Sequence, residues 1–125
     1  MKIQEIEKGV SGIYHIVFDD GGRKPLVYVG EAQCINSRWD KHIYDLKGGY
    51  HVNSYMQNVL NKHGCDNFEF KVFEVIDGST QKERHVREKF WIKELKTFNG
   101  AKTYDGYGFN LTEGGDGVGR GADSI

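Results

Sequence analysis

Hydrophobic and polar side chains first follow a strand-like pattern along the chain. Residues 12–18 and 26–30 are rich in β-branched and aromatic side chains, and the turn residues Asp20, Gly21 and Gly22 lie between them. This combination predicts a β-hairpin. Residues 68–76 alternate apolar with charged side chains, which predicts a further, half-buried strand.

A helix-like apolar spacing follows the hairpin. It predicts a helix over about residues 36–46, with Asn36 or Ser37 as its cap and Gly48 and Gly49 as its stop. The buried stripe of this helix consists of Ile35, Trp39, Ile43 and Leu46.

Two more helices are predicted by the same spacing. One covers about residues 52–62 and ends at Gly64, and its buried side holds Val52, Met56, Val59 and Leu60. The other begins at Thr80, which forms a capping-box pattern with Glu83, and its buried side holds Val86, Phe90, Trp91, Ile92 and Leu95. The order strand, strand, helix, helix, strand, helix predicts an α+β domain with a small, largely antiparallel sheet packed against helices.

Length and composition fit one soluble globular domain. The chain has 125 residues, of which 38% are hydrophobic and 28% charged. No apolar run is long enough to cross a bilayer, and the N-terminus lacks the apolar core of a signal peptide, so we expect a cytoplasmic protein without a membrane partner. Cys34 and Cys65 lack metal-site spacing, and we expect no disulfide between them in a reducing compartment.

Charge is segregated along the chain although the net charge is only −1. Residues 82–102 carry an excess of lysine and arginine, whereas the charged residues within 105–125 are mainly acidic. The segregation indicates a basic face on a nearly neutral protein, and a solvated helix face is the alternative.

The predicted hairpin carries two tyrosines, Tyr14 and Tyr28. If they pair across the strands, the turn is centred on Gly21, where the sequence provides turn residues. Cross-strand partners share one face of a sheet, so both phenols are expected to point the same way. The alternative is a pair of amphipathic tyrosines at the rim of the sheet.

The helix that follows the hairpin places Arg38, His42 and Asp45 on one face, because they are spaced i, i+4 and i+7. The helix starts close to the Tyr28 end of the hairpin, so Arg38 is expected near both tyrosines. An arginine that is simply solvated is the alternative.

Glu88 lies beside the apolar stripe of the third helix, four residues before Ile92. A carboxylate in such a place requires a partner or a cation. An ion pair with Arg84 or Arg87 is one explanation, and a bound metal ion is the other.

These five side chains suit phosphodiester chemistry: Tyr14, Tyr28, Arg38, His42 and Glu88. A single carboxylate can hold a hard divalent ion such as Mg²⁺, which polarises a phosphoryl oxygen and stabilises the leaving oxygen. Arginine neutralises charge on the pentacovalent centre. A phenol has an ordinary pKa of about 10, so it needs a nearby cation to act as a general base.

At these residues the sequence resembles the GIY-YIG nuclease superfamily, and closely the catalytic domain of phage group I intron homing endonucleases. The resemblance lies in GIYHI, VYVGEA, SRWDKHIYDLKGGYH, NKHG, EKFWIKEL and GFNLTEGGDG, which follow in the family's order over about residues 11–117. Val29 replaces the second isoleucine of the signature. The resemblance implies a three-stranded antiparallel sheet flanked by helices.

The resemblance also implies roles for individual residues. Tyr14 matches the tyrosine that acts as general base or orients the attacking water, and Tyr28 matches the second tyrosine of the signature. Glu88 matches the metal-binding glutamate, with one Mg²⁺ or Mn²⁺ ion per active site. The remaining matches are Arg38 as the essential arginine, His42 and His51 as assisting histidines, and Asn110 as an asparagine that steadies the site.

The implied activity is that of a divalent-metal-dependent endonuclease acting on double-stranded DNA, in a bacterial or phage-infected cell. Residues 1–117 would form the nuclease domain, and residues 118–125 a glycine-rich tail that starts a linker. The chain would be a stand-alone nuclease or the catalytic domain of a longer homing enzyme. We expect Arg84, Lys93 and Lys96 to contact DNA phosphates.

Two other functions stay open from the sequence. One is a nucleic-acid-binding module that does not cleave, and the other is a restriction or structure-specific repair nuclease on the same fold. A double-strand break requires a dimer or two sequential nicks, because one active site cuts one strand at a time. No protein partner is evident from the sequence.

Overall fold

The computed structural model describes residues 1–22, 24–99 and 108–114. Its order of elements agrees with the sequence prediction except for a two-residue strand at the N-terminus, which is too short to show a periodic pattern. In chain order the elements are β1 (Lys2–Ile3), β2 (Gly12–Phe18), β3 (Leu26–Ala32), α1 (Ile35–Gly48), α2 (Ser54–His63), β4 (Phe68–Val75) and α3 (Gln81–Leu95).

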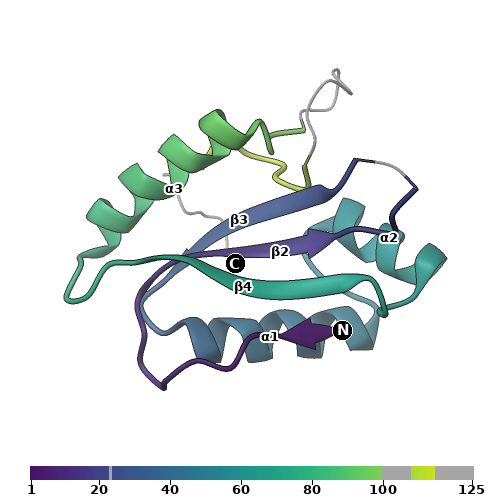
Figure 1. Cartoon of the computed structure of the whole chain (residues 1–125), viewed down its shortest axis with the longest axis horizontal. Helices are drawn as coiled ribbons and strands as arrows, with labels where there is room; N and C mark the ends of the chain where they lie inside the picture. Colours follow the sequence, from purple (N-terminus) through teal and green to yellow (C-terminus); the bar gives the residue numbers. More distant parts are fainter. Residues whose placement is uncertain (23, 100–107, 115–125) are drawn as a thin grey trace.

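The predicted α+β class is confirmed. The strands form one sheet in the order β1-β4-β2-β3, in which β2 is antiparallel to both of its neighbours and β1 pairs in parallel with β4. Helix α3 lies on one side of the sheet, and α1 and α2 lie on the other (Figure 1).

The register of the hairpin differs from the predicted one. Tyr14 lies opposite Gly30, and Tyr28 lies opposite Ile16, so the predicted Tyr14–Tyr28 pairing is wrong by two positions. A shift of two keeps every side chain on its face of the sheet, because side chains alternate with a period of two. The two phenols therefore still share a face, and their ring centroids are 6.3 Å apart.

The turn explains the shift. The side chain of Asp19 accepts a hydrogen bond from the backbone N–H of Gly21, and that of Asp20 accepts one from Gly22, each at 2.9 Å. These bonds move the centre of the turn from Gly21 toward Gly22.

The helix ends agree with the sequence in most places. Gly49 ends α1 in the left-handed conformation with φ 85°, and Thr80 and Glu83 form the predicted capping box of α3. The predicted caps of α1 are wrong, since Asn36 and Ser37 lie inside the helix. Cys34 occupies the cap position and makes no side-chain capping bond.

The main core lies between the sheet and the two helices α1 and α2. It contains, among others, Phe18, Phe68, Phe70, Trp39 and Met56. A smaller cluster under α3 is built on Ile13, Val29 and Ile92.

Three side chains predicted to be buried are exposed. Val52 is 84% exposed and Val86 is 62% exposed, and Phe90 is also on the surface. Val52 precedes α2 rather than belonging to it. On α3 the buried side is occupied partly by Arg84, so its apolar side chains do not all fit beneath the helix.

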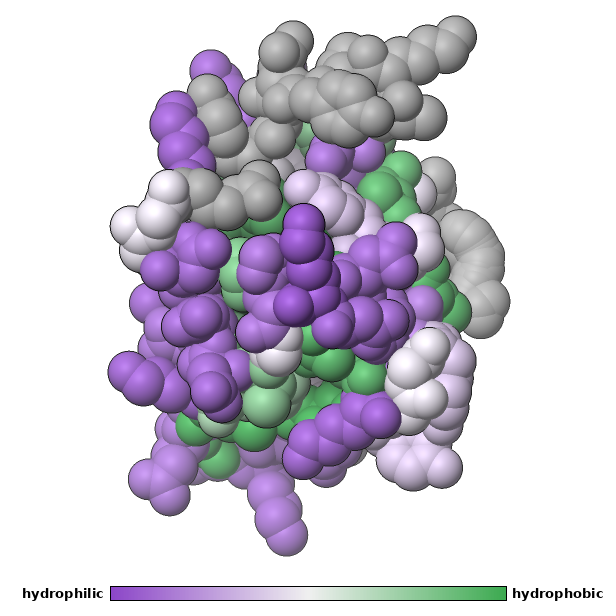
Figure 2. Space-filling view, turned by 90° about the vertical axis from the view of Figure 1, so that its right-hand side faces the viewer, coloured by the Kyte–Doolittle hydropathy of each residue, from purple (hydrophilic) through white to green (hydrophobic). Residues whose placement is uncertain are grey.

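Hydrophilic side chains dominate the face seen in Figure 2, with smaller apolar areas between them. Cys34 and Cys65 are free, half-buried thiols. Within residues 1–22, 24–99 and 108–114, no helix has the length and apolar character needed to cross a bilayer.

Candidate active site

Tyr14 is the centre of the candidate site. Its side chain is only 1% exposed and lies over Gly30 on the neighbouring strand. A Cβ atom at Gly30 would be 2.3 Å from Tyr14 Cζ, so only glycine leaves room for the phenol. The rings of Tyr28, Trp39 and His42 surround it, at centroid distances of 6.3, 6.2 and 5.7 Å.

A chain of hydrogen bonds runs from the Tyr14 hydroxyl into the protein. The hydroxyl oxygen is 2.7 Å from His42 Nε2, and His42 Nδ1 is 2.6 Å from His51 Nε2. The backbone N–H of Asn53 donates to His51 Nδ1 at 2.9 Å. The structure thus brings His42 and His51 together with Tyr14.

Burial and neighbouring charges set the proton affinity of the two tyrosines. Burial raises the pKa of Tyr14 well above its usual value, the nearby Tyr28 raises it further, and the Arg38 guanidinium opposes this rise. The pKa of Tyr28 is raised by burial and by the Glu88 carboxylate, and lowered in part by Arg38. Both tyrosines therefore lie within electrostatic reach of Arg38, as the sequence predicted, and also of Glu88.

His42 and His51, the two histidines in this series of hydrogen bonds, are neutral at neutral pH. Burial lowers the pKa of His42 well below its usual value, and the adjacent His51 lowers it further. Burial also lowers the pKa of His51 to about 4. Neither ring can therefore supply a positive charge to Tyr14, and Arg38 is the cation that faces both phenols.

Asn110 holds the strand that carries Tyr28. Its amide donates to the carbonyl oxygen of Val29 and accepts from the Val29 N–H, both at 2.9 Å, and it also accepts from Thr97 Oγ1 at 2.7 Å. Val29 lies between Tyr28 and Gly30, so this clamp fixes the backbone on both sides of it. The arrangement fits the steadying role that the family resemblance implies for Asn110.

Glu88 lies on α3, and Gly114 packs beside it, since a Cβ atom at Gly114 would be 3.1 Å from Glu88 Oε1. The two arginines considered as its partners have other carboxylates: Arg84 pairs with Glu31, and Arg87 pairs with Glu74 at 3.0 Å.

Glu88 is the candidate ligand for a divalent ion. No cluster of three or more histidine, cysteine, aspartate or glutamate side chains suited to a metal occurs in the described ranges. A single carboxylate does suit an Mg²⁺ ion that keeps several waters and binds a substrate phosphate.

Arg84 is not the surface cation that the sequence predicted. It is 5% exposed, its Nε donates to Glu31 Oε1 at 2.9 Å, and its Nη1 donates to the carbonyl oxygen of Ser79 at 2.6 Å. Glu31 also contacts His85 Nε2 at 3.3 Å. The prediction that Arg84 tracks DNA phosphates is therefore wrong, because its charge is buried and already paired.

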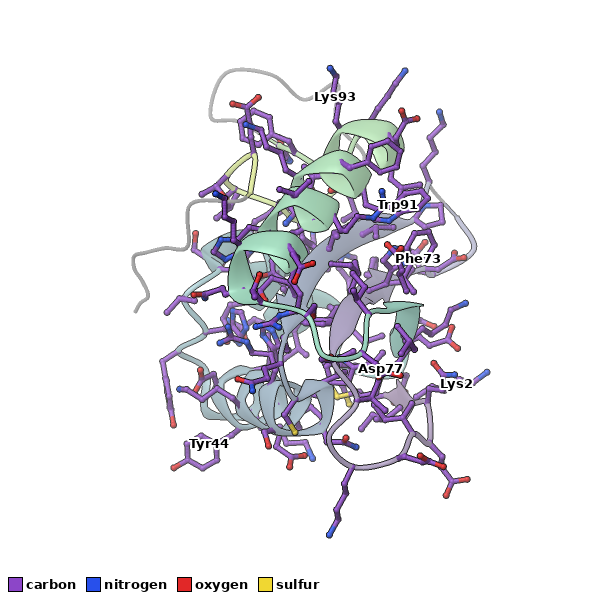
Figure 3. All side chains as sticks on the ribbon, turned by 90° about the vertical axis from the view of Figure 1, so that its left-hand side faces the viewer. Lys2, Tyr44, Phe73, Asp77, Trp91 and Lys93 are labelled. Carbon is purple, nitrogen blue, oxygen red and sulfur yellow. The ribbon has the colours of Figure 1, made fainter. Side chains whose placement is uncertain are left out.

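The other two predicted DNA contacts are on the surface. Lys93 and Lys96 are exposed at the C-terminal end of α3, and Lys93 projects outward from the helix (Figure 3). The structure leaves both side chains accessible to a large ligand.

A cleft of about 680 Å³ adjoins the site. It lies between the first turns of α1 and α3 and shares Arg38 with the candidate site. Lys41, Ser37 and Thr80 also line it. Glu31 and Arg84, which pair with each other, line it too. An anionic chain that reaches Arg38 would therefore meet cationic and polar side chains together with one carboxylate that Arg84 neutralises.

The sequence prediction missed three polar side chains that support the site: Glu31, Asn53 and Thr97. Glu31 directly follows the second signature triplet, and Asn53 has the residue type and position of a helix cap, so both had a local signal. Thr97 had none, because its bond to Asn110 depends on how the C-terminal segment returns to the sheet.

Comparisons with known proteins agree with this geometry. A family model described as the GIY-YIG catalytic domain matches residues 10–105. The chain is 40% identical over 88 residues to Intron-associated endonuclease 1 of Enterobacteria phage T4, a match that covers 70% of this chain and 34% of that protein. The chain therefore spans about a third of the length of this curated relative.

Two solved structures are similar to this fold. The catalytic domain of the homing endonuclease I-TevI matches with a TM-score of 0.62 and 36% identity, covering 78% of this chain and 96% of that one. A glutamate-to-alanine mutant of the same catalytic domain matches with a TM-score of 0.59 and 37% identity, covering 73% of this chain and 87% of that one.

Proposed function

Since the chain belongs to the GIY-YIG catalytic domain family, we propose that it is a DNA endonuclease that hydrolyses phosphodiester bonds. The relatives, one named as an intron-associated endonuclease and one as the catalytic domain of a homing endonuclease, support this reading, and we propose that this chain carries the catalytic part of such an activity. We assign the nuclease domain to residues 1–117. The proposed glycine-rich tail, residues 118–125, lies outside the described residues.

One observation carries the proposal. The Tyr14 hydroxyl is buried, is held by His42 at 2.7 Å, and lies within electrostatic reach of Tyr28, Arg38 and Glu88. A phenol in such surroundings is poorly explained as a rim tyrosine. It is well explained as a group that handles the proton of an attacking water.

Each residue of the site has a separate role in the proposed reaction. With Tyr14 as the phenolate, water attacks phosphorus in line and its proton passes to the phenolate oxygen of Tyr14. The bond from phosphorus to the leaving oxygen breaks, and that oxygen leaves with the electron pair of the bond. Arg38 neutralises the negative charge that grows on the phosphoryl oxygens. Tyr28 helps to position the reacting groups, and Asn110 holds the strand on which Tyr28 lies.

We further propose that Glu88 binds one divalent ion, Mg²⁺ or Mn²⁺. When bound, the ion polarises a phosphoryl oxygen and stabilises the leaving oxygen. The half-buried position of Glu88 beside Tyr14 and Tyr28 supports this assignment.

Double-stranded DNA is the proposed substrate, and the cytoplasm of a bacterial or phage-infected cell is the proposed location. One strand would enter the cleft beside Arg38 and Lys41, and Lys93 and Lys96 would contact backbone phosphates. A second copy of the chain or a second binding event would be needed to cut both strands.

The DNA contacts can be tested by charge reversal. We expect Lys93→Glu and Lys96→Glu to weaken DNA binding, because each removes a phosphate contact, and to lower the slope of log affinity against log salt by about 1 each. Binding is measured by fluorescence anisotropy over a salt series. An unchanged slope in both variants would remove these lysines from the interface.

The activity is tested by nicking of supercoiled plasmid in Mg²⁺, in Mn²⁺ and in EDTA. Glu88→Ala and Arg38→Ala should abolish metal-dependent nicking. Glu94→Ala on α3 and Lys47→Ala on α1 are the matched controls, because both side chains are exposed on the same helices. Cleavage that survives Glu88→Ala would contradict the metal assignment.

A wild-type chain that nicks nothing would be fused to an unrelated DNA-binding domain and tested again. If the fusion also fails to cut the DNA that it binds, the chain is a non-cleaving nucleic-acid-binding module. Cleavage of branched DNA in preference to linear DNA would indicate a structure-specific nuclease instead of a homing type.

A further inference from the structure

The series of hydrogen bonds that starts at the Tyr14 hydroxyl ends at the backbone N–H of Asn53, which can only donate. A backbone N–H always donates, so His51 Nδ1, which receives the Asn53 N–H at 2.9 Å, must be an unprotonated acceptor. The single proton of a neutral His51 ring is then on Nε2. This nitrogen faces His42 Nδ1 at 2.6 Å, and it must donate to it.

The same argument fixes the tautomer of His42. Because His42 Nδ1 accepts from His51, the proton of a neutral His42 is on Nε2, which faces the Tyr14 hydroxyl at 2.7 Å. The phenolic oxygen of Tyr14 therefore accepts this bond. The opposite direction would put a proton on His51 Nδ1, directly against the Asn53 N–H.

The geometry of the two rings is that of an in-plane hydrogen bond. The planes of His42 and His51 differ by 16° and their centroids are 4.9 Å apart, while the two nitrogens are 2.6 Å apart. Rings that meet in this way lie edge to edge, so that a lone pair of one points along the N–H of the other. Low pKa values, about 4 for His51 and lower than usual for His42, leave each ring with a single proton at neutral pH.

We propose that the backbone N–H of Asn53 sets the tautomers of His51 and His42, so that His42 donates its Nε2 proton to the oxygen of Tyr14. Two further hydrogen bonds fix the position of Asn53. Its side chain accepts from the Met56 N–H at the start of α2 and donates to the carbonyl oxygen of Phe109 at 2.6 Å. Asn53 is thus a positioning residue and does not touch substrate.

The catalytic consequence rests on the proposed nuclease function, whereas the tautomers themselves do not. A hydrogen bond to an ionised oxygen is stronger than one to a neutral oxygen, so the His42 donor favours the phenolate of Tyr14 over the phenol. Arg38 acts in the same direction. His42 cannot remove the proton of Tyr14, because its Nε2 already carries one, and it serves to stabilise the phenolate that takes a proton from water.

The first test is nuclear magnetic resonance of the whole chain with ¹⁵N-labelled histidine at neutral pH. Long-range ¹H–¹⁵N correlations distinguish the two neutral tautomers of each ring. We expect a protonated Nε2 and a bare Nδ1 for both His42 and His51. A protonated Nδ1 on either ring overturns the proposal, whether or not the protein cuts DNA.

The second test uses two side chains of similar size at position 51. In His51→Gln an amide N–H can still donate to His42 Nδ1, whereas in His51→Glu the carboxylate can only accept and pulls the His42 proton onto Nδ1. We expect His51→Glu to have a kcat about a hundredfold or more below that of His51→Gln, with similar KM, as for other active sites whose histidine is in the wrong tautomer. The His42 spectrum should show the reversed tautomer only in His51→Glu.

Equal kcat values in two folded variants with different His42 tautomers would overturn the catalytic part of the proposal. Circular dichroism of both variants checks that they are folded. If His51→Glu is unfolded, the spectrum of the wild-type chain still decides the tautomers.

Discussion

At the scale of single residues, Gly30 and Tyr14 form a complementary pair across the neighbouring strands β3 and β2. The phenol occupies the space that a side chain at position 30 would need, and Tyr14 is enclosed by Trp39 and His42 on its other sides. This packing fixes the Tyr14 ring in the position in which its hydroxyl bonds to His42. The glycine of the second signature triplet is thus explained by packing against the tyrosine of the first.

Gly30→Ala tests this pairing. The added Cβ would displace the Tyr14 ring, so we expect nicking to fall about a hundredfold or more, with a stability loss on the order of 1–3 kcal/mol. Gly22→Ala is the matched control, since its Cβ would meet only Asp20 Oδ1 at 3.7 Å, and it should keep full activity. Plasmid nicking and urea unfolding measure the two effects, and a fully active Gly30→Ala would contradict the proposed place of Tyr14.

Asn110 is the second single residue for which we make a prediction, because its side chain bonds the backbone of Val29 directly. Asn110→Ala leaves the N–H and the carbonyl oxygen of Val29 without side-chain partners inside the protein. We expect a loss of about 2–4 kcal/mol in the free energy of unfolding, since each unsatisfied buried group costs about 1–3 kcal/mol. The exposed Asn58→Ala on α2 serves as control, and equal losses in both variants would show that the clamp contributes nothing.

At the scale of elements, the position of α3 decides where Glu88 lies. Besides the apolar cluster of Ile13, Val29 and Ile92, two polar contacts among the described residues attach this helix to the sheet. One is the buried pair of Arg84 with Glu31 on β3, and the other is the half-exposed group in which Glu74 on β4 accepts from Arg87 and from Trp91. Phe73 and Trp91 meet beside the second contact with their ring planes at 89° (Figure 3).

The two attachments should differ in strength. Glu31→Gln leaves the Arg84 charge buried without its partner, so we expect a loss of about 3–5 kcal/mol in unfolding free energy. Glu74→Gln breaks a pair whose side chains are 31% and 38% exposed, and we expect less than about 1 kcal/mol. Urea unfolding of both variants checks the order, and the opposite order would mean that the buried pair does not anchor α3.

At the scale of the whole molecule, the buried His42 and His51 and the half-buried His15 make stability depend on pH. Burial lowers the pKa of His15 and of His51 to about 4, and it lowers that of His42 well below the usual value of 6.5. In the unfolded chain these rings take up protons near pH 6.5, whereas in the folded chain they do so only at lower pH. The unfolded state therefore binds more protons in this range, and the stability that is present above about pH 6.5 is lost as the pH falls.

We expect the free energy of unfolding to fall between about pH 6.5 and pH 4 by up to about 1.4 kcal/mol per pH unit for each of these histidines. Urea unfolding at a series of pH values measures the slope. In His51→Gln one contribution is removed and the slope should be smaller. A slope that stays the same in this variant would contradict the burial of a neutral His51.

Some parts of the site could be predicted because they depend on local spacing. Tyr14, Tyr28, Arg38 and Glu88 were predicted from strand alternation and helix periodicity, and the even shift in register left both tyrosines on the expected face. The prediction for Arg84 was wrong because periodicity alone does not reveal a buried partner. Glu31 is on a strand distant in the sequence, and only packing brings the two together.

The sequence by itself determined the order of the elements, the α+β class and the capping box at Thr80, because each follows from interactions within a few residues along the chain. Tertiary structure alone decided the burial of Arg84 and the chain of donors from Asn53 to Tyr14. These features join residues far apart in the sequence, such as Tyr14 and His42. The bonds between such residues form only when the sheet and the helices pack together. A pattern within a short stretch of sequence therefore does not predict them.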